Sequence, residues 1–249
     1  MANTGKNKLV RWARLFVGGY DLSADSVGLD KCENSMELVE LTGWSDSVVH
    51  GLASQSRKVG IYGYQAYLND TALSGAYTIL KTPATRTVSL LFGGGAEPTY
   101  GDPAYIIDAA QINNLGSFES GSARFAADFI PHPAYYLTGS PLAVILSPNV
   151  ARTATFNGTS HNNGAASTNG YHATMHIIAS SGGTWAYTIE QSTTGAFAGE
   201  ETTLATFTVN GSAVTGEYKS ATGNVAQYLR ARGVRTSGTC TVIICIARK

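Results

Sequence analysis

Short segments in which side chains alternate between two faces recur along this 249-residue chain, and Gly, Ser and Thr separate them. In residues 57–68, for example, Val59, Ile61 and Tyr67 fall on one face of an extended backbone. A period of two is the spacing of β-strands. It predicts strands at residues 14–22, 36–42, 57–68, 86–92, 103–115, 122–130, 171–179, 184–191, 202–209, 226–235 and 239–248. The chain is therefore expected to be mainly β, with a β-sandwich architecture.

One segment, residues 71–80, departs from this alternation. Its apolar residues lie at helical spacing, Asp70 or Thr71 can serve as the N-cap, and Pro83 follows to stop a helix. The sequence predicts one short helix there, flanking the first β-sandwich.

A polar stretch divides the chain into two parts. Residues 148–170 are rich in Asn, Gly, Thr and Ser, which is typical of a linker or a long loop. We therefore expect a β-sandwich domain with an N-terminal arm at residues 1–147, and a second β-sandwich at residues 171–249.

The surface is expected to carry few charges. Charged residues make up 14% of the chain, against about 25% in a typical soluble domain. Lys plus Arg and Asp plus Glu number 17 each, so the formal net charge is zero. This balance argues against a basic face for sequence-specific nucleic-acid binding. The low charge indicates that much of the surface is covered by copies of the chain or by other partners.

The N-terminal segment lacks the apolar region of a signal peptide, and no stretch approaches about 20 consecutive apolar residues. We expect no membrane insertion. Cys32, Cys240 and Cys245 are too few for a disulfide scaffold. The last two lie five positions apart in a predicted strand, so they should face opposite sides and remain unbridged.

No motif in the sequence points to catalysis. The glycines at 93–95 lack the Gly-Lys-Ser/Thr ending of a phosphate-binding loop. His172 and His176 share one strand face, but no Cys, Asp or Glu lies nearby to complete a metal site, so a solvated or interface face is favoured. Glu200 and Glu201 are predicted to be solvated loop charges. We expect no enzyme activity, no cofactor and no metal.

One strand of the second module offers a candidate binding face. Alternation places Tyr228, Arg230 and Arg232 on the same side, and Trp185 is predicted to lie near them. Such an aromatic and arginine row can bind a sugar, including a cell-surface saccharide, or a partner surface. The alternative is an ordinary outer face on which the Arg stems shield Tyr228.

The segment RLFVGGYDLSAD, residues 14–25, begins as a strand and runs into two glycines. Gly18 and Gly19 indicate a bend or a point of close backbone approach. Asp21 and Ser23 can close a local side-chain turn.

This segment also carries a resemblance, together with ELVELTGWSDSVVHGL and SRKVGIYGYQAYL further along the chain. The order of strands and turns resembles the N-terminal pattern of the tail tube, or major tail protein, family of tailed bacteriophages. The matching positions are residues 19–23, Gly43, Trp44 and residues 60–64, within a resemblance that covers residues 14–147.

The resemblance implies a β-sandwich subunit that forms hexameric rings, which stack into a tube through which DNA passes as non-specific cargo. It implies a location in the virion after assembly in the host cytoplasm, and contacts with other virion proteins. It also implies that the second module is an outer decoration domain, similar to immunoglobulin-like or carbohydrate-binding-like modules. The predicted contacts between subunits are Trp12, Tyr20, Asp21, Trp44, Arg57 and Lys58.

Two other functions stay open at this stage. One is a capsid cement or decoration protein, and the other is a carbohydrate-binding virion adhesin that uses the face around Tyr228.

Overall fold

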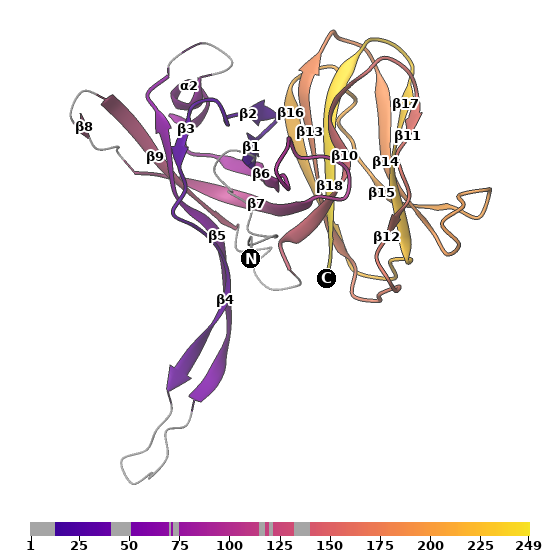
Figure 1. Ribbon diagram of the computed structural model, residues 1–249, viewed down its shortest axis with the longest axis horizontal. Helices are drawn as coiled ribbons and strands as arrows, with labels where there is room; N and C mark the ends of the chain where they lie inside the picture. The colour runs from indigo at the N-terminus through magenta and orange to yellow at the C-terminus, as the bar shows by residue number, and fades with distance from the viewer. Residues whose placement is uncertain are drawn as a thin grey trace, which may run out of the picture.

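Figure 1 shows the computed structural model of the chain, which describes residues 13–40, 51–69, 71, 75–114, 118–119, 122–131 and 140–249. Trp12, Gly43 and Trp44, which the sequence analysis singled out, lie outside these residues.

The fold is mainly β with one short helix, as predicted (Figure 1). The strands of the N-terminal half are β1 (Ala13–Val17), β2 (Tyr20–Asp21), β3 (Ser26–Gly28), β4 (Lys31–Glu40), β5 (Gly51–Tyr67), β6 (Thr85–Phe92), β7 (Pro103–Asn114), β8 (Phe118–Glu119) and β9 (Ser122–Pro131). Those of the C-terminal half are β10 (Leu142–Arg152), β11 (Phe156–Asn157), β12 (His161–Asn162), β13 (Tyr171–Ser180), β14 (Trp185–Ser192), β15 (Thr202–Thr206), β16 (Thr215–Ala221), β17 (Tyr228–Arg235) and β18 (Cys240–Arg248).

The described strands form two antiparallel sheets. The larger follows the order β16-β13-β18-β10-β7-β6-β1-β2, and β9 and β5 continue it from β7, with β3 and β4 on β5 and β8 on β9. The smaller has the order β11-β17-β14-β15, with β12 also on β17. The larger sheet therefore runs through both halves of the chain.

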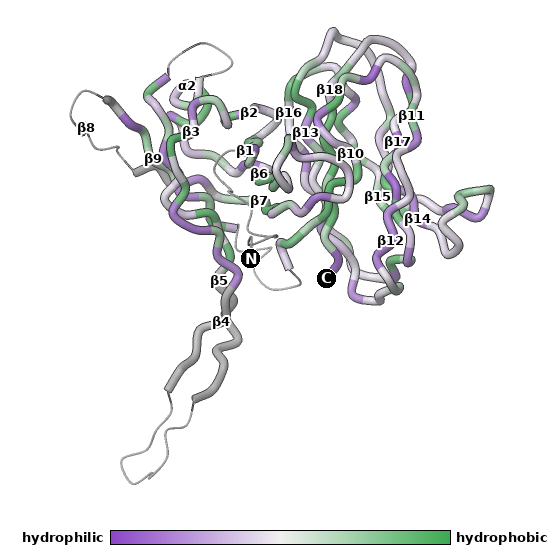
Figure 2. Tube along the Cα trace, in the orientation of Figure 1, coloured by the Kyte–Doolittle hydropathy of each residue, from purple (hydrophilic) through white to green (hydrophobic). Residues whose placement is uncertain are grey.

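The C-terminal half is a β-sandwich. The inner faces of the smaller sheet and of β13 and β18 meet in one hydrophobic core, which includes Trp185, Tyr187, Ile189, Met175 and Ile244. Figure 2 shows the hydrophobic residues concentrated along β18 and β10. Burying large apolar side chains from facing sheets is the main force that holds such a sandwich together.

The N-terminal half folds around a separate core. Buried side chains of β1, β5, β6, β7 and β9 pack together with the helix α2 (Ala76–Leu80). The helix is shorter than predicted, and its N-cap is Gly75, with no side-chain hydrogen bond to the first turn. Thr71 is therefore not the cap of this helix, which begins at Ala76, where Ala76, Ile79 and Leu80 are buried. Asp70, the other predicted cap, lies outside the described residues.

A third cluster joins the two halves. Phe16 and Leu91 from the first half pack against Ile145, Ile243 and Cys245 from the second. The opposite face of β18 contributes Cys240 to the sandwich core, so the two cysteines face opposite sides, as predicted. All three cysteines are free, and burial raises the pKa of Cys245 to about 12.

β10 crosses the predicted domain boundary at residue 147. Its first residues pair with β7, and the rest of the strand pairs with β18 through two irregularities in register around Ser147. Such bulges bend a strand, which lets one strand serve both halves. The linker predicted at residues 148–170 carries the end of β10 and the short strands β11 and β12. The division into two domains at residues 147 and 171 stays a prediction.

Candidate assembly and binding surfaces

A two-stranded ribbon projects from the N-terminal half (Figure 1). It consists of residues 34–40 of β4 and residues 51–59 of β5, and we call it the projecting ribbon. β4 pairs with β5 from Lys31↔Tyr62 to Glu40↔Gly51, whereas β9 pairs with β5 only from Ile61 onward. Within the described part of the chain, the two strands of the ribbon therefore have only each other as ladder partners.

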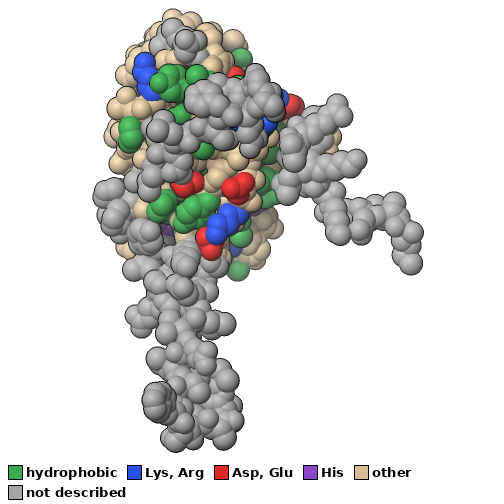
Figure 3. Space-filling view, turned by 90° about the vertical axis from the view of Figure 1, so that its left-hand side faces the viewer, with side chains coloured by type: hydrophobic (Ala, Val, Ile, Leu, Met, Phe, Trp, Pro, Cys, Tyr) green, Lys and Arg blue, Asp and Glu red, His purple; other side chains and the backbone are tan. Residues whose placement is uncertain are grey.

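The root of the ribbon is fixed to the body. The Gly60 amide donates to the Tyr105 hydroxyl at 2.9 Å, and that hydroxyl donates to the Glu33 carbonyl on the other strand. The Gly63 amide donates to Asp128 Oδ1 at 2.7 Å. Figure 3 shows charged side chains of both signs beside hydrophobic ones on this side of the molecule. These hydrogen bonds, one buried and two partly buried, thus hold the root of the ribbon against the body.

The paired glycines after β1 form a seam between the halves. Gly18 and Gly19 both have positive φ, 58° and 93°, and a Cβ on Gly19 would lie 2.5 Å from the Thr215 amide nitrogen on β16. The predicted close approach at these glycines is confirmed, and the segment that it meets belongs to the C-terminal half. The predicted local turn is also present, since the Ser23 amide donates to Asp21 Oδ1 at 2.9 Å.

A buried histidine completes the seam. The Gly19 amide donates to His176 Nδ1 at 3.1 Å, so the neutral ring carries its proton on Nε2, which lies 2.9 Å from Ser89 Oγ. Ser89 Oγ in turn lies 2.8 Å from Thr174 Oγ1. His176 is fully buried, and burial lowers its pKa to about 3. The predicted alternative of a solvated face for His172 and His176 is wrong, because the N-terminal half covers His176 and the Tyr218 ring of β16 stacks on His172.

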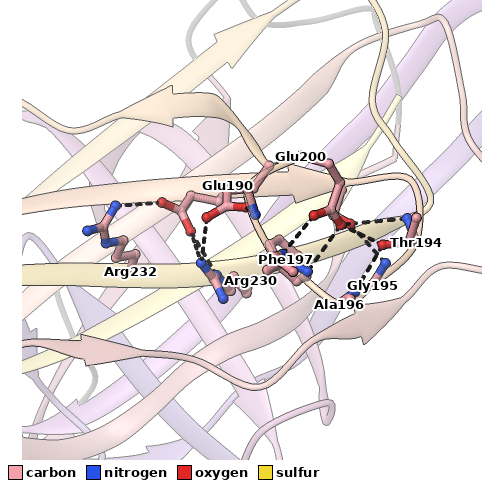
Figure 4. Close-up of polar contacts among 12 residues, drawn as sticks. Glu190, Thr194, Gly195, Ala196, Phe197, Glu200, Arg230 and Arg232 are labelled. Carbon is pink, nitrogen blue, oxygen red and sulfur yellow. Dashed lines mark hydrogen bonds and ion pairs between the residues drawn. The ribbon is translucent and has the colours of Figure 1, made fainter.

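The outer face of the smaller sheet carries a network of charges (Figure 4). Tyr228, Arg230 and Arg232 alternate with buried residues along β17, so they share one face, as predicted. Glu190 on β14 accepts hydrogen bonds from Arg230 Nε at 2.7 Å and Arg232 Nη1 at 2.9 Å. The Glu190 side chain is only 5% exposed, so this carboxylate depends on the two arginines for its compensation.

A loop of the same chain covers part of this face. Residues 193–201 fold back so that the Phe197 ring lies 4.3 Å beneath the guanidinium carbon of Arg230. Glu201 also reaches Arg230, at 3.5 Å. The ring of Tyr228 lies against Gly195, where an added Cβ would approach it to 2.7 Å. The chain itself therefore covers Arg230 and part of Tyr228, whereas the Arg232 side chain is 42% exposed.

Glu200 holds this loop in shape (Figure 4). Its carboxylate accepts hydrogen bonds from Ser192 Oγ at 2.7 Å and from the amides of Phe197 at 3.1 Å and Ala198 at 2.7 Å. The hydrogen bonds from the Ser192 and Thr194 hydroxyls are the main causes that lower the pKa of Glu200 to about 2. The sequence suggested a solvated charge here, and the several Ser, Thr and Gly residues around it were the signal for a loop closed by a carboxylate.

The predicted binding residue Trp185 lies elsewhere. It is 2% exposed and stacks on Tyr187 in the sandwich core, so its predicted place on the surface face is wrong. Trp185, Tyr187 and Ile189 alternate on one side of β14, and the size of that apolar face requires its burial.

The predicted subunit contacts fall in different places. Arg57 and Lys58 are paired with Met36 and Ser35 on the projecting ribbon. Tyr20 packs against the N-terminal core, and Asp21 closes the turn at the seam. A role for any of these residues between subunits stays a prediction.

No group of three or more His, Cys, Asp or Glu that could hold a metal ion occurs among the described residues. The same residues contain no helix that is both long and apolar enough to span a membrane.

Comparisons with known proteins complete the description. No family model matches the chain, and no curated protein matches it. Among solved structures, the chain is similar to the SPP1 Dit protein, described as a paradigm of the hub adsorption apparatus in phages that infect Gram-positive bacteria. The two share 13% sequence identity over 96% of this chain and 100% of that one, with a TM-score of 0.35.

Proposed function

We propose that the chain is a structural subunit of a tailed-phage virion that assembles with copies of itself through the projecting ribbon. In the finer form of the proposal it is the tail tube subunit, which builds hexameric rings that stack around passing DNA. The observation that carries the proposal is the ribbon, whose described strands pair only with each other.

A ribbon of this kind is incomplete by itself. An isolated two-stranded hairpin is at best marginally stable in water, and its outer edges present unpaired amides and carbonyls. Pairing with a strand of another subunit supplies the missing hydrogen bonds. Because all subunits are identical, such contacts close most simply into a symmetric ring.

The composition supports the same function. A surface with 14% charged residues suits a chain whose faces are covered by neighbours. The resemblance of residues 14–147 to tail tube proteins is the reason for proposing a tube rather than another part of the virion. The C-terminal sandwich, with its own core, then stands as a decoration module on the outer side of the ring.

Electron microscopy of the purified full-length protein tests the proposal, with sedimentation velocity on the same sample. Rings and stacked tubes are expected. Isolated monomers at all concentrations contradict self-assembly. Single rings that do not stack would contradict the tube and would support a ring-shaped element instead, such as the hub named for the SPP1 Dit protein. Binding only to preformed capsids supports the decoration protein instead.

A variant in the ribbon locates the contact. Val39→Pro removes an amide donor from β4 and disfavours the strand, so rings are expected to disappear. The free energy of unfolding of the body should change by less than about 1 kcal/mol, since Val39 lies at the end of β4, beyond the part of β5 that pairs with β9. Val39→Thr, which keeps the β-branch and the amide, serves as the matched control and should still assemble.

A further inference from the structure

Asn-Gly pairs occur only in the C-terminal half of the chain, at residues 157–158, 163–164, 169–170 and 210–211. In this dipeptide the backbone readily attacks the side chain, because glycine has no Cβ to block the approach. The glycine nitrogen bonds to the asparagine Cγ and closes a cyclic imide. The fold decides which pair can react, since the attack needs an amide that is not already a hydrogen-bond donor and a backbone that can turn.

In two of the pairs the attacking amide is already a donor. The Gly158 amide donates to the Ala231 carbonyl at 2.7 Å, next to the ladder of β11 with β17. The Gly164 amide donates to Asn162 Oδ1 at 2.8 Å. Each of these hydrogen bonds must break before the nitrogen can attack, which slows the reaction by about 3- to 10-fold.

The third pair is held by its backbone. Asn169 forms an isolated β-bridge with Gly223. The Gly170 carbonyl accepts a hydrogen bond from the Lys249 amide at 2.9 Å, and a Cβ on Gly170 would lie 1.9 Å from the Ala221 carbonyl oxygen. Closing the imide ring requires the Asn169–Gly170 peptide to rotate, and these neighbours on both sides oppose that rotation.

The fourth pair has neither restraint. Asn210 and Gly211 lie in the connection between β15 and β16, and the Gly211 amide donates to no group within the described chain. The Asn210 side chain is exposed, and the Ser212 amide donates to its Oδ1 at 3.2 Å. This bond folds the side chain back over the Gly211 peptide. It also stabilises the negative charge that develops on Oδ1 during the attack.

The burial of Gly211 favours the same reaction. The glycine packs against Trp185, whose Cδ1 would lie 3.0 Å from an added Cβ. A buried amide without a partner is unfavourable, and the imide no longer has this N–H group. We propose that Asn210 is a site of spontaneous modification, at which the asparagine converts to isoaspartate and aspartate.

The reaction consumes one water and releases one ammonia. The Gly211 nitrogen gives its proton to hydroxide and bonds to Asn210 Cγ, while Nδ2 takes up a proton and leaves as ammonia. Water then opens the imide, and opening at the backbone carbonyl carbon gives isoaspartate, in which the main chain runs through the former side chain. The product adds a carboxylate and one backbone carbon at the connection between the two sheets of the sandwich.

Peptide mapping by mass spectrometry tests the proposal on full-length protein aged at mildly alkaline pH, with electron-transfer fragmentation to separate isoaspartate from aspartate. Conversion at Asn210 should be at least about 3- to 10-fold faster than at the other three asparagines. In urea, where the fold no longer protects them, the rates should converge. Asn210→Gln should abolish the signal at this position, because the longer side chain closes its ring far more slowly.

A protected pair can also be made reactive. Asn162→Ala removes the acceptor of the Gly164 amide, so Asn163 should convert about 3- to 10-fold faster than in the unaltered chain. Asn162→Asp keeps the acceptor and is the matched control, with no rise expected. Asn157 reports general loosening in the same molecules, and its rate should stay low. If it rises equally, the rates in the unaltered chain decide.

A rate at any other Asn-Gly pair that equals or exceeds the rate at Asn210 in the folded protein overturns the proposal. No conversion at Asn210 overturns it as well. An unchanged rate at Asn163 in the Asn162→Ala variant, with Asn157 still protected, would show that the hydrogen bond of the attacking amide does not control the reaction.

Discussion

The C-terminal sandwich and the projecting ribbon differ in how their polar groups are paired. In the sandwich, Glu190 is held by two arginines, and residues 193–201 cover part of the same face. In the ribbon, the described strands have only each other. The difference teaches that folding of a single chain pairs the polar groups of one region, whereas the other keeps open strand edges, which a neighbouring subunit would pair under the proposed function.

The largest expected effect measures how much the core of the sandwich contributes to the free energy of unfolding. Trp185→Ala removes a buried ring that stacks on Tyr187 at a centroid distance of 5.8 Å, so the free energy of unfolding should fall by about 3–5 kcal/mol. Urea denaturation measures it. Trp185→Phe is the control and should cost much less, because the indole nitrogen makes no hydrogen bond that Phe would lose. A loss below about 1 kcal/mol in the alanine variant would contradict the role of this core.

The second-largest loss of stability is expected in the charge network on the outer face of the smaller sheet. Glu190→Gln leaves Arg230 and Arg232 side by side without their carboxylate, and breaking a buried pair of this kind costs about 3 kcal/mol. Glu201→Gln is the matched comparison. Its ion pair with Arg230 is longer, 3.5 Å, and more exposed, so the loss should be much smaller than that of the Glu190 variant. Equal losses in the two variants would show that the Glu190 network does not set the stability of this face.

The seam offers a pair of neighbouring glycines with different surroundings. Gly19→Ala combines a positive φ with a Cβ only 2.5 Å from the Thr215 backbone, so a loss of about 2–3 kcal/mol is expected. Gly18→Ala has a positive φ but open space, with its nearest atom 4.0 Å away, so strain alone should cost about 1–2 kcal/mol. Thermal melts compare the two. A larger loss for Gly18 would mean that the halves are not in contact at this point.

The smallest effect is a pH dependence that His176 confers. Burial lowers its pKa to about 3 in the folded chain, whereas the unfolded chain binds the proton near pH 6.5. The contribution of His176 is therefore fully present above about pH 6.5 and is lost as the pH falls toward 3, by at most about 1.4 kcal/mol per pH unit. Urea midpoints measured from pH 7 to pH 5 give this slope. Most carboxyl groups titrate below this range of about two pH units. His176→Asn keeps an acceptor for the Gly19 amide and should flatten the curve; an unchanged slope would assign it to other groups.

Local alternation was sufficient for much of the fold. Strands at residues 171–179 and 239–248 were predicted within about two residues of β13 and β18, because both are short segments rich in apolar and β-branched residues with turn residues on either side. The shared face of Tyr228, Arg230 and Arg232 follows from the same rule. The glycines at 18 and 19 were identified as a close approach because their lack of a side chain is visible in the sequence.

What could not be predicted depends on contacts between distant segments. Glu190 lies opposite Arg230, 40 positions along the chain, and only the pairing of β14 with β17 brings them together. The burial of His176 requires the N-terminal half to pack on β13, which no local pattern reveals. Residues 148–152 have the composition of a loop, yet they continue β10 because β18 offers them a ladder partner.

The strand β10 makes the molecule a mechanical unit. Its first residues are hydrogen-bonded to β7 in the N-terminal half, and its later residues to β18 in the C-terminal half, within one continuous sheet. The halves are therefore connected by the ladder pairs of β10 with β7 and β18 and by the apolar cluster that contains Phe16 and Ile145. If the proposed rings form, this connection predicts that the C-terminal halves turn together with the rings that carry them.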